Sequence, residues 1–327
     1  MITERENFFR MARRETPAFV SHQPGLLQMV LPSALRDRGP SESGGRGQDW
    51  FGTWWTTDES MPTSPVPDPA KPYVLDDITE WESVIAWPDL SRIDWAACAA
   101  RDLPEGREPS KILCLMLVSG PFERLHDLMG FENALISLIT EPEACHAFFR
   151  RLCDFKIEQL GYLKRYYDPD MVHFQDDWGN QKDLFFDPAL WREIIAPEVR
   201  RVVEAAHELG LLFDMHSCGR IDRVADDIVS WGVDVLDPAQ PVNDLERWAR
   251  EYNGKLIIMG GLNAQDIIDN ASATDAEIRA ETRRKLDLFA TGGYYIPFAV
   301  SLSPRLEVAF DEVLKYGREF YGRQTRL

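Results

Sequence analysis

Residues 211–219 read Leu-Leu-Phe-Asp-Met-His-Ser-Cys-Gly, a short apolar run that ends at a glycine. A run of this length and composition indicates a buried strand that reaches the edge of a sheet or the mouth of a barrel. Because residues i and i+2 of a strand face the same side, His216 and Cys218 would present an imidazole and a thiol together. Those two groups are half of a tetrahedral zinc site. A packed cysteine beside a hydrogen-bonded histidine is the other interpretation of this stretch.

The alternation of apolar runs and helical segments continues on both sides of this stretch. From about residue 111 onward a strand followed by a helix is repeated six times, with connections of a few residues. Parallel strands joined by helical crossovers follow from that pattern. The predicted strands are 112–118, 171–175, 211–216, 233–236, 256–260 and 293–298.

The number of strands decides between two α/β architectures. A TIM-type barrel needs eight strand–helix units, so the missing strands must come from the first 110 residues, where 17–21 is one candidate. An open doubly wound sheet is the alternative, but no G-x-G-x-x-G follows a strand. We therefore predict an α/β (β/α)8 TIM-type barrel. In this single domain, residues 1–110 would form an N-terminal extension packed on the barrel, and residues 111–327 would form its main part.

Residues 34–75 differ from the rest of the chain in composition. They are rich in Pro, Gly, Ser and Asp and contain Trp50, Phe51, Trp54 and Trp55. A polar loop with four large aromatic side chains should fold over something apolar. It could be a lid on a pocket, or an arm packed on a second subunit of a homodimer.

The composition limits the classes of function. The 327 residues include 36 Lys and Arg against 54 Asp and Glu, a net charge of −18. This charge argues against nucleic acid and anionic membranes as partners, and it suits a protein with a basic patch. No run of 18 apolar residues predicts a membrane span, and the charged N-terminus lacks the apolar core of a signal peptide. Five cysteines without framework spacing indicate reduced thiols, so we expect a cytoplasmic protein.

The carboxyl ends of the strands are where a parallel β/α protein carries its chemistry. Each candidate there also has a structural alternative: Asp177-Trp178-Gly179 is turn chemistry, Asp237-Pro238 is a common strand exit, and Glu123 could pair with Arg124. The polar and aromatic residues at the predicted ends nevertheless form one candidate site. They are Ser119, Phe122, Glu123, Arg124, Asp176, Asp177, Trp178, His216, Cys218, Asp237, Gln240, Asn263, Gln265, Pro297, Phe298 and Ser301.

Several stretches, in this order and spacing, resemble the uroporphyrinogen decarboxylase superfamily, and most of all its branch of corrinoid-dependent methyltransferases. The resemblance spans almost the whole chain and implies a (β/α)8 barrel preceded by an N-terminal extension. The similar stretches are Phe9-Arg10-Met11-Ala12-Arg13-Arg14, Trp50-Phe51-Gly52, Leu128-Met129-Gly130-Phe131-Glu132-Asn133, Gln175-Asp176-Asp177-Trp178-Gly179, His216-Ser217-Cys218-Gly219, Gly260-Gly261-Leu262-Asn263 and Gly292-Gly293-Tyr294-Tyr295.

Two departures from the family's patterns separate its branches. Porphyrinogen decarboxylases carry an early R-Q-A-G-R stretch for substrate propionates, where this chain reads Ser-His-Gln-Pro-Gly at 21–25. Zinc-dependent methylcorrinoid:thiol methyltransferases bind zinc through H-x-C and a later cysteine. Here His216 and Cys218 match, but residues 292–304 contain no cysteine. A zinc site would need a carboxylate, Asp176 or Asp177, as third ligand.

The remaining branch implies the substrate-side methyltransferase of an anaerobic O-demethylase system. Such an enzyme moves a methyl group from a methoxylated aromatic, an aryl methyl ether, to the cobalamin-type cob(I)amide of a partner corrinoid protein. The aromatic loop at 50–55 and Phe298 suit an aryl ether, and the acidic surface suits a protein partner. The residues expected to bind substrate are Trp54, Trp55, Phe122, Glu123, Trp178, Asn263 and Phe298.

The expected chemistry is activation of the ether oxygen, because phenolate leaves badly. We expect His216 and Asp177 at that oxygen, either directly or through zinc, with Cys218 as a further ligand. Without a metal, Tyr294, Tyr295 or His216 would be the acid. Two alternatives remain: a cofactor-free decarboxylase in which Asp176 places the proton, and a barrel that only binds a corrinoid or porphyrin.

Overall fold

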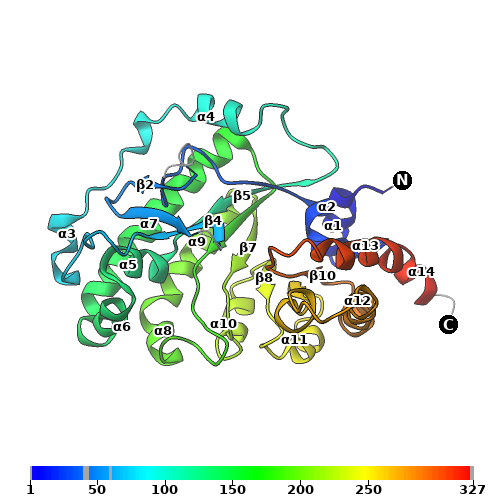
Figure 1. The fold of residues 1–327 in the computed structure, drawn as a ribbon. Helices are drawn as coiled ribbons and strands as arrows, with labels where there is room; N and C mark the ends of the chain where they lie inside the picture. Colours follow the sequence, from blue (N-terminus) through cyan, green and yellow to red (C-terminus); the bar gives the residue numbers. More distant parts are fainter. Residues whose placement is uncertain (1, 40–43, 59–60, 325–327) are drawn as a thin grey trace.

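The computed structural model describes residues 2–39, 44–58 and 61–324. Within these residues seven parallel strands form one curled sheet in the order β1-β5-β6-β7-β8-β9-β10. The sheet belongs to an α/β fold, as predicted, and it is curled in the manner of a TIM-type barrel (Figure 1). The eighth strand of the predicted barrel is not among the described residues. The strands are β1 Leu27–Val30, β5 Ile112–Leu117, β6 Met171–Gln175, β7 Leu212–His216, β8 Val235–Ala239, β9 Ile257–Gly261 and β10 Tyr295–Phe298.

Helices connect successive strands of this sheet, as the alternating pattern predicts. The long helix α7 follows two shorter ones between β5 and β6, and its first residue is a proline, which suits the first turn of a helix. The crossover helices are α5 Pro121–Met129, α6 Phe131–Thr140, α7 Pro142–Tyr167, α8 Pro188–Ile194, α9 Ala196–Glu208, α10 Ala225–Ser230, α11 Leu245–Glu251 and α12 Asp275–Phe289. After β10 come α13 Leu306–Tyr316 and α14 Phe320–Gln324. None of the described helices combines the length and the apolar character needed to cross a membrane.

The first 110 residues contribute one strand to the main sheet and several elements around it. Helices α1 Glu4–Ala12 and α2 Gln23–Leu26 lie beside α13, where the Val20 amide donates to the Gly317 carbonyl (Figure 1). Strands β2 Gly47–Gln48, β3 Trp54–Asp58 and β4 Met61–Pro67 form a separate antiparallel sheet. Helices α3 Trp81–Val84 and α4 Trp95–Asp102 follow on the way to β5.

The strand predicted at 17–21 is wrong. The backbone of this segment is bound by Asn7, whose side chain accepts from the Ala18 amide and donates to the Phe19 carbonyl. These bonds satisfy backbone groups that a strand would have paired with a neighbour. The strand at this end of the sheet is β1 instead, and Leu27 pairs in parallel with Ile112.

Alternate residues of the strands feed two different cores, as expected for strands that are buried on both faces. In β5, Leu113, Leu115 and Leu117 belong to the large core against the helices. Ile112 and Cys114 point to the other side, where Phe8 of α1 joins a second core. Helix α1 therefore packs against the inner face of the curled sheet, and the polar side chains gather at the opposite, carboxyl ends of the strands.

Buried ion pairs attach the segment that precedes β3 to helices α5 and α7. Lys156 on α7 places its Nζ 2.7 Å from Asp37 Oδ1, and both side chains are fully buried. Arg124 on α5 places its Nη1 2.6 Å from Asp49 Oδ2, again with both side chains fully buried. These pairs hold Asp37 and Asp49 against the end of the sheet where the candidate site lies.

Most of the aromatic residues predicted to form a lid or an arm in the 34–75 segment pack against other elements of this chain. Trp50 and Phe51 contact Phe155 of α7, with ring centroids 5.9 and 6.0 Å apart. Trp55 is buried and donates its indole N–H to Asp49. Trp54 is 39% exposed and lies under the Lys71 ammonium.

Candidate functional site

Three side chains with metal-binding atoms meet at the carboxyl ends of β6 and β7. His216 Nε2 lies 3.6 Å from Asp177 Oδ1 and 3.6 Å from Cys218 Sγ. Asp177 follows β6, and the parallel register pairs Gln175 of β6 with His216 of β7. The adjacent strand ends therefore bring together residues that are 39 and 41 positions apart in the chain.

A glycine after Cys218 makes this arrangement possible. Gly219 has a φ of +84°, and a Cβ added there would lie 2.2 Å from the carbonyl carbon of Gly179. No other residue type could hold this conformation at such close approach without displacing the neighbouring loop. The turn at Gly219 thus packs the loop that follows β7 against the loop that carries Asp177.

The imidazole of His216 is held by a carboxylate on the next strand. Its Nδ1 lies 3.1 Å from Asp237 Oδ1 of β8. Burial by itself would lower the pKa of His216, but the charge and hydrogen bond of Asp237 raise it well above its ordinary value. The same negative field would attract a metal cation, with Nδ1 engaged and Nε2 directed at Asp177 and Cys218.

The donor set fits zinc. Ligand atoms at about 2.0–2.3 Å from a tetrahedral ion lie about 3.3–3.8 Å from one another, and both 3.6 Å separations fall in that range. The three ligand atoms of Asp177, His216 and Cys218 all lie within 4.8 Å of one another. Three protein ligands with one position open are typical of a catalytic zinc site. Asp237 on the far nitrogen of His216 is the outer partner that such a ligand usually has.

A second pair lies beneath this group, towards the centre of the sheet. His173 Nδ1 is 2.9 Å from Asp214 Oδ2 and 3.5 Å from Asp237 Oδ1. The rings of His173 and His216 lie 5.0 Å apart. His173 thus extends the support of Asp237. Burial and the charge of Asp237 raise the pKa of Asp214 to about 6.

Of the two neighbouring aspartates, Asp177 joins His216 and Cys218, and Asp176 lies outside this group. Asp176 is fully buried and accepts from the Phe122 and Glu123 amides at the start of α5 and from the Trp178 indole. Its carboxylate therefore anchors a helix N-terminus. Asp177 points the other way, and 31% of its side chain is exposed.

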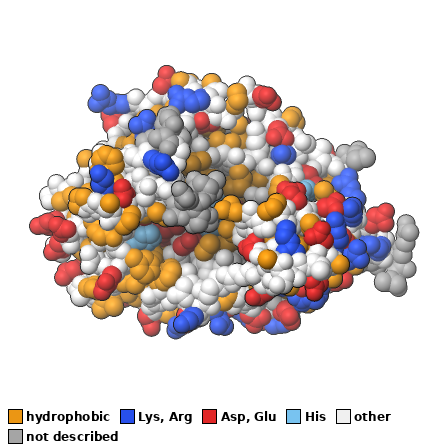
Figure 2. Space-filling view, viewed as in Figure 1, with side chains coloured by type: hydrophobic (Ala, Val, Ile, Leu, Met, Phe, Trp, Pro, Cys, Tyr) orange, Lys and Arg blue, Asp and Glu red, His pale blue; other side chains and the backbone are white. Residues whose placement is uncertain are grey.

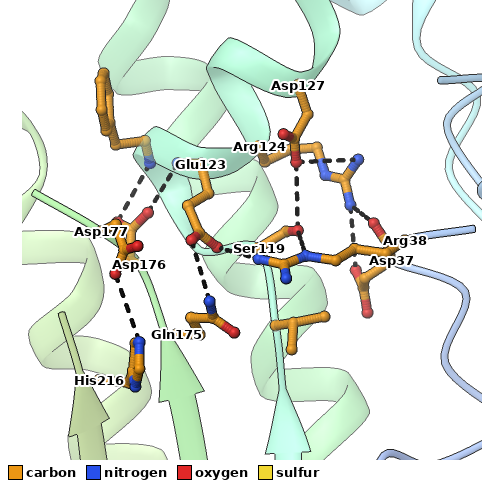
Figure 3. Close-up of polar contacts among 12 residues, drawn as sticks. Asp37, Arg38, Ser119, Glu123, Arg124, Asp127, Gln175, Asp176, Asp177 and His216 are labelled. Carbon is orange, nitrogen blue, oxygen red and sulfur yellow. Dashed lines mark hydrogen bonds and ion pairs between the residues drawn. The ribbon is translucent and has the colours of Figure 1, made fainter. Parts of the chain in front are cut away.

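A second polar group borders the first at the ends of β5 and β6. Glu123 Oε2 lies 3.0 Å from Arg38 Nη2, and Glu123 Oε1 lies 3.4 Å from Gln175 Nε2. Figure 3 shows this group beside Asp177 and His216. Burial first, and then the charges of Asp177 and Asp127, raise the pKa of Glu123 to about 7.

A cavity of about 460 Å³ opens at the ends of β8, β9 and β10. It adjoins the group of Asp177, His216 and Cys218, called the zinc-type group below. Gln240 in the cavity wall accepts a hydrogen bond from the amide of Gly219, the residue after Cys218. Figure 2 shows a hollow on this face where acidic and hydrophobic side chains meet. The described lining residues include no Lys or Arg and four carboxamides. The lining is Gln181, Pro238, Gln240, Pro241, Val242, Leu262, Asn263, Ala264, Gln265, Asp266, Asp269, Phe298, Ala299 and Val300.

The other residues predicted for the site are placed differently. Phe122 and Trp178 are fully buried, with Phe122 against Phe186 and Trp178 against Trp191. Tyr295 is buried and donates its hydroxyl to the Gly260 carbonyl, so the structure does not bring it to Asp177. Trp55 contacts Arg38 of the second polar group, whose guanidinium carbon lies 5.9 Å from the centre of the Trp55 ring.

Sequence reasoning missed two contributors to the polar groups. Arg38 comes from the loop after β1, which the misplaced strand at 17–21 concealed. Gln175 was quoted only as part of a motif, although its position one residue before Asp176 is a strand end. A correct assignment of the apolar run 26–30 as a strand would have pointed to Arg38.

The fold and the site together define an α/β protein with a curled parallel sheet and a metal-type polar group at its carboxyl ends. This chain belongs to the uroporphyrinogen decarboxylase (URO-D) family, whose model matches residues 59–309.

Two further comparisons are more distant. A methylated-thiol–coenzyme M methyltransferase from Methanosarcina mazei is 24% identical over 194 residues, which are 58% of this chain and 50% of that protein. The chain thus spans about half the length of this curated relative. The structure of N-acetyl-D-glucosamine-6-phosphate deacetylase from Mycobacterium smegmatis covers 77% of this chain and 67% of its own, at 12% identity. Its TM-score of 0.31 is too low for the likeness to carry any inference.

Proposed function

We propose that this protein is a methyltransferase that moves a methyl group from a methoxylated aromatic to the cob(I)amide of a separate corrinoid protein. The observation that carries the proposal is the group of Asp177, His216 and Cys218 beside a cavity at the strand ends. Membership of the URO-D family, the methyl-transfer activity in the name of the M. mazei relative and the resemblance to the corrinoid-dependent branch support it.

The cavity suits the aromatic part of such a substrate. Its volume of about 460 Å³ lies within the range of small-molecule sites. Phe298, Leu262 and Val300 offer apolar surface to a ring, and Asn263 offers an amide. Asp266 and Asp269, with no cation among the described lining residues, favour an uncharged ether over a carboxylated one.

The polar group suits the ether oxygen, which must accept the electron pair of the broken C–O bond. Asp177, His216 and Cys218 would hold zinc, and bound zinc would act there as a Lewis acid. The chain's own part is to fix the group: Asp237 orients His216, and the Cys218 amide donates to Asp177 Oδ1 at 2.7 Å. The methyl carbon must stay open to in-line attack by the cob(I)amide substrate, which the hollow on this face allows.

A second candidate, methyl transfer to a thiol, is favoured by the printed name of the relative. Its zinc would bind through the same group, with Asp177 in place of the family's later cysteine. A decarboxylase is disfavoured, because Asp176, its expected proton carrier, lies outside the group and its carboxylate anchors the start of α5.

An anaerobic ultraviolet–visible assay tests the proposal. The protein is mixed with reduced cob(I)alamin or its corrinoid protein, and with a panel of methoxylated phenols, with and without zinc. Growth of methylcob(III)alamin is the expected result. His216→Ala should abolish it, while His146→Ala, at a partly exposed histidine on α7, should not. Full activity of His216→Ala would refute the role of this group. No transfer with any ether would favour the thiol reaction or a decarboxylase, and a thiol acceptor and CO2 release would be tested next.

A further inference from the structure

The Glu123 group is a polar constellation that the proposed zinc-type chemistry does not use. Glu123 lies in the first turn of α5, and only 6% of its side chain is exposed. Its two oxygens are held by different elements: Arg38 from the loop after β1, and Gln175 at the end of β6. Arg38 is itself held by Ser119, whose Oγ accepts from the Arg38 Nε at 3.3 Å. A carboxyl group fixed in this way is preorganised rather than merely solvated.

Glu123 lies beside the zinc-type group, at the ends of neighbouring strands. Gln175, its hydrogen-bond partner, is the register partner of His216 on the adjacent strand. Figure 3 shows Glu123 and Gln175 on one side and Asp177 with His216 on the other. One hydrogen bond and one register pair thus link Glu123 to the strand end that carries His216.

We infer that Glu123 is the general acid that delivers a proton to the phenolate oxygen as the methyl group departs. The inference rests on the proposed methyl transfer from an aryl ether. The cobalt electron pair of the cob(I)amide forms the new Co–C bond, and the C–O bond breaks with its electron pair passing to oxygen. Cobalt is thereby oxidised from Co(I) to Co(III). The Glu123 carboxyl proton moves to that oxygen, the phenol leaves, and solvent restores the proton to Glu123.

The electrostatic surroundings keep a proton available on Glu123 near neutral pH. Burial raises the pKa of this carboxyl to about 7, although Arg38 and His216 act in the opposite direction. A general acid works best when its pKa lies near the operating pH. The charged or titratable groups that act on or contact Glu123 from the surrounding elements are Arg38, Asp127, Asp176, Asp177 and His216.

The variant Glu123→Gln tests the inference, since an amide keeps the hydrogen bonds but has no acidic proton. The assay follows methyl transfer to cob(I)alamin from methoxybenzenes whose ring substituents make the leaving phenol more or less acidic. An unactivated ether releases a phenol of pKa about 10, and its rate should fall by about 100- to 10,000-fold. Ethers of acidic phenols should lose far less, because their phenolates need no proton. Glu198→Gln, at a buried ion-paired glutamate on α9, is the matched control.

An equal loss for all the ethers would overturn the acid role and make Glu123 a structural residue. Failure of the wild-type protein to transfer methyl from any ether would overturn the proposed function and the inference together. Arg38→Met provides a check that does not depend on Glu123→Gln folding. Loss of the guanidinium should raise the pKa of Glu123 and move the alkaline fall in rate to higher pH, and an unmoved or oppositely moved profile would overturn the inference.

Discussion

Replacing Lys156 by methionine should strongly destabilise the protein. The Lys156 ammonium is fully buried, lies 2.7 Å from Asp37 Oδ1 and donates to the Val118 carbonyl at 2.7 Å. Methionine fills similar space but leaves the buried Asp37 carboxylate without its nearest cation. Breaking a buried pair on one side costs about 3–5 kcal/mol.

The remaining contacts of Asp37 place the expected cost at the lower end of that range. Gln159 Nε2 still donates to Asp37 Oδ2 at 3.3 Å, and Arg124 Nη2 stays 3.9 Å from Asp37 Oδ1. We therefore expect a loss of about 3 kcal/mol in the free energy of unfolding. The double variant Asp37→Asn with Lys156→Met removes both charges, so it should lose less than Lys156→Met alone.

Equilibrium urea unfolding, followed by tryptophan fluorescence and circular dichroism, measures these differences. Lys164→Met is the control, because Lys164 lies on the same helix and pairs with the exposed Asp168. Exposed pairs contribute about 0–1 kcal/mol. A Lys156→Met variant that is no less stable than Lys164→Met would refute the buried pair as an anchor of Asp37.

Two further predictions concern the metal and the pH dependence of stability. Asp237→Asn should lower zinc affinity by about 10- to 100-fold, because His216 loses its orienting partner. A chelator competition should show no such loss for Asp234→Asn, which alters a surface aspartate–histidine pair. Burial alone would raise the pKa of Asp170, but hydrogen bonds from Arg5 and Arg107 lower this pKa below its ordinary value of 3.8. The ionised Asp170 therefore stabilises the folded protein above pH 3.8, and this stabilisation is lost as the pH falls further. Unfolding measured at several acidic pH values should therefore show a shallower acid loss for Asp170→Asn than for the natural chain, and identical acid limbs would contradict this account.

The periodicity of the sequence was sufficient to predict the strands that carry the site. The run 211–216 is a strand in the structure from Leu212 to His216, so His216 and Cys218 had to emerge at its carboxyl end. Strand 112–118 is buried along nearly its whole length, because its apolar residues face a core on each side. The α/β class follows from the same alternation of strands and helices.

Long-range pairing decided what the pattern left open. The sequence pattern does not distinguish Asp176 from Asp177. Helix α5 approaches the end of β6, where Asp176 binds its first amides, and Asp177 is left beside His216. The segment 17–21 has strand composition, but Asn7 took its backbone hydrogen bonds and Leu27–Val30 became the strand.

The sequence by itself determined the α/β class, the strand that carries His216 and Cys218 and the position of the site at the strand ends, because these depend on neighbours a few residues apart. Only the tertiary structure decided that Asp177 joins them, that Asp237 orients the imidazole and that Arg38 meets Glu123. Those contacts join residues 21 to 85 positions apart. Such contacts depend on strand register and loop packing, which no local pattern encodes.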